Sequence, residues 1–440
     1  MLNFTNFRPQ VHWLYLCLAL LLCYLGRPAF AGGEQSFTLA VIPDTQNYID
    51  FRHQKAAGFE LDAADLFIQQ MRYVASRSVN NGGDIAFVAS VGDVWQHQTK
   101  TIDQAHLARG IGIEPSPILA RRAKRADEVM NIELPRAIEG YRIISASGLP
   151  FGVAPGNHDY DAAWSVIGYP PNRNKTWSEI SFTVADMGIM HVGGLDNFRH
   201  VFGADTDFFR DKTWYVASYN GGSSSAQRFS AGGYEFLHIA LEMQPGDAVL
   251  RWAQSVLEKY PGLPTIVTTH DYLSTAGKRL PNPLIDLARI EPENHNSAEQ
   301  LWRKFLRRHD QIFLVLCGHQ HGQGFRVDAN LDGNPVYQVL ADYQARGQTA
   351  LQAGRRKRVG VGDGWLRLMT FDFAASPAQI TIKTFSSHYG QYSSDLPQYA
   401  AWYREKEQPG MSDSEFLAAD DFVIRLDGFA KRFVSARQAD

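Results

Sequence analysis

The chain has few cysteines, little net charge and no hydrophobic run of the length that a membrane span usually needs. Only three of its 440 residues are cysteine, which excludes a disulfide-rich scaffold and a structural zinc site made of several thiolates. The formal net charge of −3 provides no general attraction to nucleic acid or to an anionic membrane. An anionic ligand would therefore need a local positive site, such as a bound metal ion.

The apolar run Leu14–Leu25 lies near the N-terminus and is followed by Ala29-Phe-Ala31, which fits a small-x-small cleavage site. Because a membrane span needs about 20 apolar residues, the run predicts a cleaved signal peptide over residues 1–31, with an uncleaved anchor as the alternative. We therefore expect an exported protein, periplasmic or extracellular, that keeps no stable membrane span after cleavage.

Cleavage would also remove Cys17 and Cys23, so no disulfide is possible within the remaining chain. Cys317 ends a predicted strand, and the simplest expectation for it is a buried free thiol. The overall composition, with 45% apolar, 12% aromatic and 20% charged residues, is that of a globular protein.

Apolar strands alternate with amphipathic helices along most of the chain. Short apolar runs predict the strands, and apolar residues at helical spacing predict the helices. The predicted strands are Phe37–Ile42, Asp84–Val91, Pro150–Ala154, Tyr234–Leu241, Thr265–Thr269 and Gln311–Leu316, and the predicted helices are Leu61–Val79, Leu119–Glu139, Ala248–Tyr260 and Ser297–Arg308. This order implies parallel strands with right-handed crossovers, an α/β fold whose sites lie at the carboxyl ends of the strands.

Two parts of the chain depart from this alternation. Residues 160–233 are rich in aromatic, Gly, Ser and Asn residues and are expected to form an insertion of long loops over the site. After residue 322, further strands are predicted at Pro335–Leu340, Trp365–Phe373 and Gln379–Phe385, as a second sheet or strand layer. We therefore expect one domain over residues 32–388 and a C-terminal extension, residues 389–440, packed on it.

Polar residues of the kinds that bind metals follow five of the predicted strands. They are Asp44 and Gln46, then Asp93, then Asn157 with His158 and Asp159, then His270, and finally His319 and His321. Taken singly, each has an ordinary explanation as a turn, capping or packed residue. Together, carboxylate, amide and imidazole groups at one sheet edge favour a site for divalent cations.

In this order the motifs resemble the calcineurin-like metallophosphoesterase superfamily, whose pattern is D-x-H, G-D, G-N-H-[DE], a single His and G-H-x-H. The match runs from Asp44 to His321 and departs from the pattern only at Gln46, where the family has histidine. The resemblance implies a four-layer β-sandwich flanked by helices. It also implies hydrolysis of a small phosphoester, either a monoester or a diester.

Carried over to this sequence, the resemblance implies two divalent metal ions (Mn, Fe or Zn) bridged by Asp93. One ion would be held by Asp44, Gln46 and His321, and the other by Asn157, His270 and His319. A hydroxide between the ions would attack phosphorus, and His158 would serve as the general acid. Asp159 would orient His158, or it could be a structural hydrogen-bond acceptor.

The glutamine at position 46 leaves alternatives open. An amide oxygen is generally a weaker ligand than imidazole, so we expect a loosely held first ion, and a mononuclear site is the alternative. A non-catalytic exported binding protein that keeps the fold is the rival interpretation. The Gly-Asp-x-x-Asp-Arg-Gly motif of protein phosphatases and the Gly-Asp-x-x-Tyr motif of purple acid phosphatases are both missing after residue 92. The sequence does not predict the oligomeric state.

Overall fold

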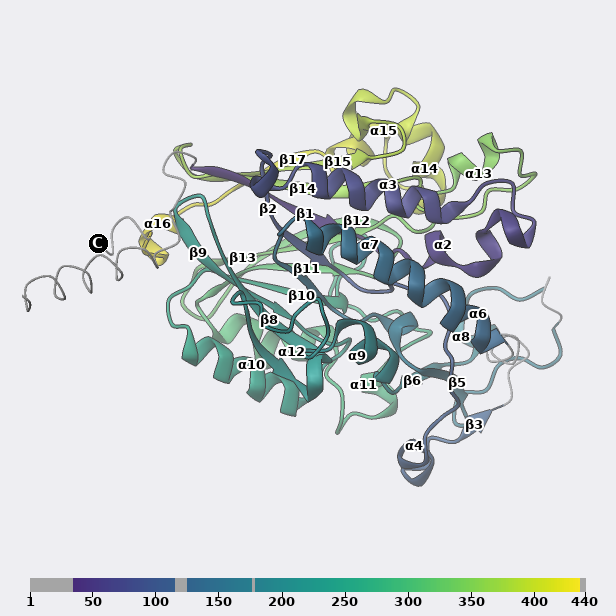
Figure 1. Ribbon diagram of the computed structural model, residues 1–440. Helices are drawn as coiled ribbons and strands as arrows, with labels where there is room; N and C mark the ends of the chain where they lie inside the picture. Colours follow the sequence, from purple (N-terminus) through teal and green to yellow (C-terminus); the bar gives the residue numbers. More distant parts are fainter. Residues whose placement is uncertain (1–34, 115–124, 176–178, 436–440) are drawn as a thin grey trace, which may run out of the picture. The chain divides into compact units, whose positions relative to one another are not determined.

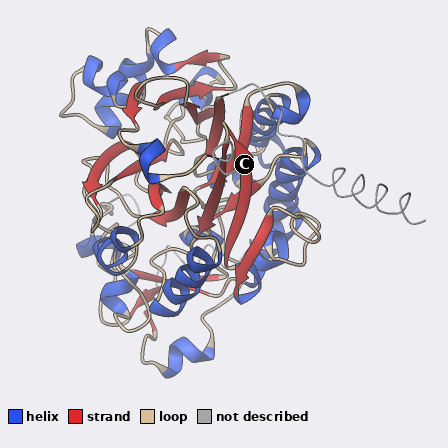
Figure 2. Ribbon diagram, turned by 90° about the vertical axis from the view of Figure 1, so that its left-hand side faces the viewer, coloured by secondary structure: helices blue, strands red, loops and turns tan. Residues whose placement is uncertain are grey.

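Two seven-stranded β-sheets form the centre of the part that the computed structural model describes, residues 35–114, 125–175 and 179–435 (Figures 1 and 2). The first sheet has the order β16 (Gln391–Tyr392), β15 (Gln379–Ser386), β14 (Trp365–Asp372), β1 (Ser36–Ile42), β2 (Ile85–Ser90) and β4 (Phe151–Val153), with β17 (Phe422–Arg425) paired to β15. The second has the order β12 (Gly322–Ala329), β13 (Pro335–Asp342), β11 (Ile312–Gly318), β10 (Thr265–Asp271), β9 (Tyr234–Ala240), β8 (Ser224–Ala231) and β7 (Tyr215–Tyr219).

Aromatic side chains fill the space between the two sheets. Phe87 of β2 stacks on Phe229 of β8, with ring centroids 4.4 Å apart. Phe371 of β14 contacts Phe236 of β9 and Phe313 of β11 in edge-to-face geometry. These buried rings belong to one continuous apolar cluster, so the sheets pack as a sandwich.

Helices cover the two outer faces of this sandwich. Helices α3 (Ala63–Ser76) and α7 (Leu134–Ala146) bury their apolar residues in a cluster with the outer face of the first sheet. Helices α10 (Asp247–Lys259) and α12 (Ala298–Lys304) do the same on the second sheet, at the opposite side of Figure 1. The predicted α/β architecture, a four-layer β-sandwich flanked by helices, is therefore confirmed.

The strands that carry the predicted site pair in parallel, as expected from the strand–helix order. Strands β1, β2 and β4 are parallel neighbours in the first sheet. Strands β9, β10, β11 and β13 are parallel neighbours in the second. The carboxyl ends of these strands consequently meet at one edge of the sandwich.

The prediction of long loops over residues 160–233 was wrong for much of that segment. Strands β7 and β8 extend the second sheet, and β3 (Ile113–Glu114), β5 (Ala162–Val166) and β6 (Met190–Gly193) form a separate three-stranded sheet. Serine, glycine and alanine dominate around β8, and such short side chains give little of the apolar alternation that identifies a strand.

The remaining helices are short and mostly lie in the connections. They are α2 (Gln46–Ile49), α4 (Gln104–Ala108), α6 (Ala126–Glu128), α8 (Val184–Met187), α9 (Asp196–Phe202), α11 (Leu287–Ile290), α13 (Gln348–Gln352), α14 (Tyr399–Glu407), α15 (Asp413–Ala418) and α16 (Phe429–Arg432). The helix predicted at 119–139 is observed from Ala126, through a π-helical turn, to the end of α7. The first residues of that predicted helix, 119–124, lie outside the described residues, and so does the whole predicted signal peptide, residues 1–31.

Within the described residues, we find no helix that combines the length and the hydrophobicity of a membrane span. Cys317 lies in β11 as a buried free thiol, as predicted, and burial raises its pKa.

The segment after β15 is fastened to the sandwich by buried charges. Asp420 accepts a 2.6 Å hydrogen bond from Arg367 and lies 3.6 Å from the guanidinium of Arg346. Arg346 also donates two 3.0 Å hydrogen bonds to Glu407 of α14. Because both arginine side chains are fully buried, they depend on these carboxylates for charge compensation.

Candidate metal centre

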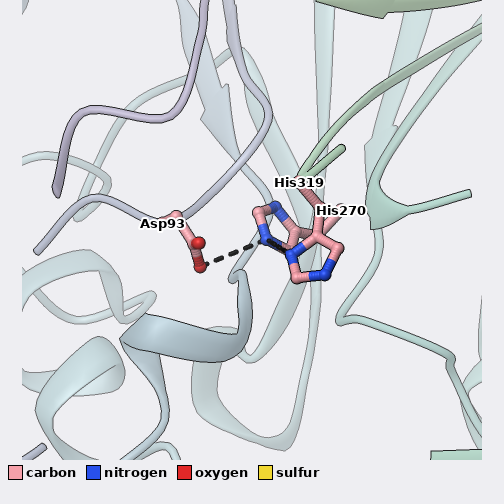
Figure 3. Close-up of side chains that lie close together, drawn as sticks. All are labelled: Asp93, His270 and His319. Carbon is pink, nitrogen blue, oxygen red and sulfur yellow. Dashed lines mark hydrogen bonds and ion pairs between the residues drawn. The ribbon is translucent and has the colours of Figure 1, made fainter. Parts of the chain in front are cut away.

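Both sheets contribute residues to a buried cluster at the shared edge of the sandwich. Asp44 and Asp93 lie in the turns just after β1 and β2, and Asn157 lies in the turn after β4. The second sheet contributes His270, near the end of β10, and His319, directly after β11. All five residues are buried. Figure 3 shows Asp93 on one side of the cluster, pointing toward the two imidazole rings.

The Nε2 atom of His270 lies at the middle of this cluster. It is 3.2 Å from Asp93 Oδ1, 3.2 Å from Asn157 Oδ1 and 3.2 Å from His319 Nδ1. It is also 4.0 Å from Asp44 Oδ2. The other ring nitrogen, Nδ1, lies 2.7 Å from the carbonyl oxygen of Val91 and is placed to donate to it. This contact directs Nε2 into the cluster, because a hydrogen bond at one ring nitrogen fixes the orientation of the ring, as it does in metal-binding histidines.

The main chain at this edge is adapted to bring the side chains close together. Asp93 and His319 both have positive φ, 51° and 72°, which is uncommon for residues other than glycine and is concentrated at functional sites. A Cβ atom at Gly156 would clash with the Asp93 carboxylate, and one at Gly318 would clash with the Asp44 carboxylate. The glycines that precede Asn157 and His319 in their motifs therefore make room for two of the carboxylates.

The carboxylates of the cluster create a negative electrostatic potential that favours a positive charge among them. Burial, together with the carboxylate of Asp342, raises the pKa of Asp44. Burial opposes ionisation of Asp93 as well, but His270 and His158 hold the pKa of that carboxyl well below its usual value. Although burial disfavours a charged imidazole, Asp93 and Asp44 raise the pKa of His270 to about 10. The carboxylates around His270 Nε2 thus favour a positive charge at the middle of the cluster.

Two residues of this cluster, Asp342 and Gln344, were not predicted from the sequence. Gln344 Nε2 donates to Asp44 Oδ2 at 3.1 Å and to Asp342 Oδ2 at 3.0 Å. Gln344 Oε1 in turn accepts a hydrogen bond from Gln46 Nε2. Asp342 ends β13, so Asp342-Tyr-Gln344 repeats the strand-end D-x-Q pattern of Asp44-Thr-Gln46. That repetition is the signal that would have identified both residues.

Gln46 is buried beside the bridging carboxylate that the resemblance implies. Its Nε2 donates to Asp93 Oδ2 at 3.1 Å, and its main-chain N–H donates to the carbonyl oxygen of Asp93 at 2.8 Å. The amide oxygen, Oε1, is buried and has no hydrogen-bond partner within the described residues. Nε2 of His319 is also buried and has no hydrogen-bond partner within the described residues. Unpartnered buried acceptors are costly, so these two atoms fit a site that binds a cation.

His158 and Asp159 lie in the turn beside Asp93, and their side chains make different contacts. His158 Nδ1 lies 2.6 Å from the carbonyl oxygen of Gln96, and its Nε2 lies 3.9 Å from Asp93 Oδ2. Asp159 accepts hydrogen bonds from the main-chain N–H groups of Val94 and Gly156, both at 2.8 Å. Burial and the charge of Asp93 raise the pKa of Asp159 to about 7. These contacts of Asp159 are those of the structural acceptor that the sequence left open.

The predicted ligand set is not brought together completely. His321 is exposed, and within the described residues no hydrogen bond or ion pair joins it to the cluster. The side chain of His158 retains 14% exposure. Solvent therefore reaches the surroundings of the cluster at His158 and His321, while the carboxylates and His270 are buried.

The donors in the cluster suit divalent metal ions of the borderline to hard classes. Asp44, Asp93 and Asn157 offer oxygen atoms, whereas His270 and His319 offer nitrogen. Three of the described residues, Asp93, His270 and His319, have donor atoms within 4.8 Å of one another. The residues present thus fit divalent metal binding.

Comparisons with known proteins find similarity both among sequences and among solved structures. No family model matches the chain. The chain is 25% identical over 274 residues to the uncharacterized protein YvnB of Bacillus subtilis, a match that covers 61% of this chain but only 16% of that longer protein. Among solved structures, a dimetal phosphatase from Danio rerio aligns with a TM-score of 0.40 and 13% identity, covering 80% of this chain and 96% of that one.

The four-layer fold, the order of the strand-end motifs and the buried cluster of Asp and His side chains agree with one another. They are consistent with the resemblance of this chain to the calcineurin-like metallophosphoesterases.

Proposed function

We propose that this protein is a metal-dependent phosphoester hydrolase that acts on a small phosphomonoester or phosphodiester. The observation that carries the proposal is the convergence of Asp93, Asn157 and His319 on His270 Nε2, each with a donor atom 3.2 Å away. A buried set of this composition has little use in a purely structural role, because it concentrates acidic groups away from water.

The residues that would hold divalent ions are Asp44, Gln46, Asp93, Asn157, His270, His319 and His321. Bound ions would supply the Lewis-acid chemistry that phosphoester hydrolysis requires. The described contacts support Asp93 as the shared ligand, since Gln46, His158 and His270 all contact its carboxylate. His321 would have to turn inward to join Asp44 and Gln46.

His158 would hold and deliver the proton that the leaving oxygen needs. A proton on Nδ1 is held by the carbonyl oxygen of Gln96, which leaves Nε2 to carry the proton that is transferred. The main-chain N–H of His158 donates to Asp93 Oδ1 at 2.8 Å, so the same residue also orients the shared carboxylate. Asp159 would act indirectly, by holding the two loops that carry Asp93 and His158 against each other.

The alternative function is that of an exported binding protein that keeps the fold, with one metal ion or without turnover. The observation that favours it is Gln46, whose Nε2 is committed to Asp93 and Gln344. Hydrogen bonds of this kind would hold the region together even if the first ion were absent.

The test is turnover of an aryl phosphate and a bis-aryl phosphate by chelator-treated protein, before and after addition of manganese, iron or zinc. We expect hydrolysis of at least one substrate only after metal addition, with close to two ions bound at the centre. His270→Ala should abolish both properties, whereas His200→Ala, which changes an exposed histidine of α9, should leave both unchanged. Metal binding without turnover of either substrate would favour the binding protein.

A further inference from the structure

A second group of histidines surrounds the carboxylate of Glu291, away from the strand-end motifs. His191 lies in β6, His106 in α4, and Glu291 and His295 in the segment between α11 and α12. Glu291 Oε2 is 2.9 Å from His191 Nε2, 3.7 Å from His106 Nε2 and 3.8 Å from His295 Nε2. Three imidazoles from separate parts of the chain thus present the same ring nitrogen to one oxygen atom.

Each of these imidazoles uses its other nitrogen for a hydrogen bond outside the group. His106 Nδ1 lies 2.6 Å from Asp103 Oδ2, and His295 Nδ1 lies 3.1 Å from the carbonyl oxygen of Gln244. His191 Nδ1 lies 2.7 Å from the carbonyl oxygen of Val192. In a neutral imidazole, a proton on Nδ1 leaves a lone pair on Nε2. The three Nε2 atoms are therefore set up as acceptors or ligands.

One carboxylate oxygen of Glu291 accepts a hydrogen bond, and the other oxygen faces the three histidines. Its Oε1 accepts a 2.6 Å hydrogen bond from Arg109 Nε, which fixes the orientation of the carboxylate. Within the described residues, neither Glu291 Oε2 nor His191 Nε2 has a hydrogen bond of acceptable geometry, although both atoms are buried. His191 is completely inaccessible to solvent and Glu291 is 6% exposed. A group bound between these two atoms would remove both unsatisfied positions.

Donor atoms of His106, His191 and Glu291 all lie within 4.8 Å of one another, and His295 Nε2 lies beside this group, 3.8 Å from Glu291 Oε2. Zinc binds imidazole nitrogen and carboxylate oxygen at about 2.0–2.2 Å, so tetrahedral ligands stand about 3.3 Å apart. The three distances to Glu291 Oε2, between 2.9 and 3.8 Å, lie on either side of that value. Three imidazoles and one carboxylate form a donor set of the type that zinc prefers, and with His295 drawn in, four protein ligands would leave no open position for chemistry.

We propose that His106, His191, Glu291 and His295 bind a structural zinc ion that joins the three-stranded sheet to the segment before α12. The ion would hold together three parts of the chain that are distant in sequence: the α4 region, strand β6 and the connection between α11 and α12. Strand β5, the neighbour of β6, begins shortly after Asp159. A zinc ion here would therefore stabilise strands β5 and β6, which come after the Asn157–Asp159 turn in the sequence.

The test is the zinc content of protein that has been stripped with chelator, incubated with zinc chloride and desalted. His106→Gln and His295→Gln are the variants of choice, because these side chains retain 14% and 16% exposure and their replacement should not prevent folding. We expect each variant to lose one zinc equivalent per chain relative to the unmodified protein. His309→Gln, which changes a partly buried histidine outside the cluster, is the matched control and should lose none.

A second measurement separates this site from the strand-end cluster. The Trp164 ring stacks on His191 and meets His106 edge to face, with centroids 4.9 and 5.0 Å away, so zinc binding should change its fluorescence. An Asp93→Asn protein should keep one zinc equivalent and the fluorescence change. Equal zinc content in the unmodified protein and both histidine variants, or an Asp93→Asn protein that binds no zinc, would overturn the proposal.

Discussion

The two histidine clusters of this protein are supported in opposite ways. Asp93, His270 and their neighbours stand at the ends of strands in two large sheets, and main-chain hydrogen bonds fix their positions. His106 and His295 belong to short helices and connections, and only His191 lies in a strand, one of four residues. The first cluster is thus held by the core of the fold, whereas the second lies among short elements around the three-stranded sheet.

This difference leads to different expectations for metal removal. The carboxylates of the strand-end cluster are positioned before any ion arrives, so loss of metal should affect chemistry more than structure. At the Glu291 cluster, the binding free energy of an ion contributes directly to the stability of the segments that it joins. The following four variants test this contrast, from the largest expected effect to the smallest.

Asp93→Asn should reduce phosphoester hydrolysis to background, because it removes the carboxylate that Gln46, His158 and His270 all contact. Asparagine is the suitable replacement, since it tolerates the positive φ of this position. Elemental analysis should show loss of metal from the strand-end cluster, while thermal unfolding remains cooperative. Asp332→Asn, at an exposed position in the turn between β12 and β13, serves as the control. Full activity in Asp93→Asn would show that the cluster is not the active centre.

His158→Asn should leave the metal content unchanged and lower turnover by about 10²–10⁴-fold for esters with basic leaving groups. Esters of acidic phenols should be affected less, because their leaving oxygen needs no proton. The measurement is kcat across a series of aryl and alkyl phosphates, with His200→Asn in parallel. Equal losses across the series would mean that His158 does not act as the acid.

Gln344→Leu should weaken metal binding at Asp44 without removing a proposed ligand. Gln344 holds Asp44 by a 3.1 Å hydrogen bond, and partners of this kind typically contribute about 10–100-fold to metal affinity. We expect the upper part of that range because the contact is buried. Chelator competition measures it, with Gln352→Leu on the exposed side of α13 as the control. If both variants release metal like the unmodified protein, Gln344 is not a positioning residue.

Asp103→Asn should reduce the zinc affinity of the Glu291 cluster toward the lower end of the same range, about tenfold, since Asp103 is 48% exposed. An asparagine can still cap α4, as the aspartate does through Oδ1, but it cannot both cap and accept from His106 Nδ1. Asp286→Asn is a close control because Asp286 caps α11 in the same manner. Identical zinc dissociation constants for the two variants would contradict the proposed role of His106.

Much of the strand-end cluster could be predicted because its residues follow a rule of the fold. A buried apolar run followed by Asp93 or His319 is visible in sequence, and parallel pairing brings such positions to one edge. Asp342 and Gln344 obey the same rule, and they were missed because the predicted strand there stopped at Leu340. The extra two strand residues bring Asp342 close enough to Asp44 for Gln344 Nε2 to donate to both carboxylates.

The Glu291 cluster could not have been predicted in this way. Its four side chains lie on a short helix, one short strand and a connection, so no regular spacing relates them. Their proximity depends on how the three-stranded sheet packs against the rest of the chain, and residues 160–233 were expected to form loops. Local sequence carries little information about contacts that only tertiary packing creates.

The buried Arg346 lies close in sequence to the metal centre, but its charge partners are in the last part of the chain to be synthesised. Only one residue separates it from Gln344, which contacts Asp44, and its charge is compensated by Glu407 and Asp420. During synthesis, the strands that carry Asp44 and His319 emerge long before those two carboxylates do. An uncompensated buried guanidinium would destabilise the turn around Gln344 until then. We therefore expect the centre to be completed late in synthesis, and a ribosome-bound chain that stops short of residue 420 to lack the proposed hydrolase activity.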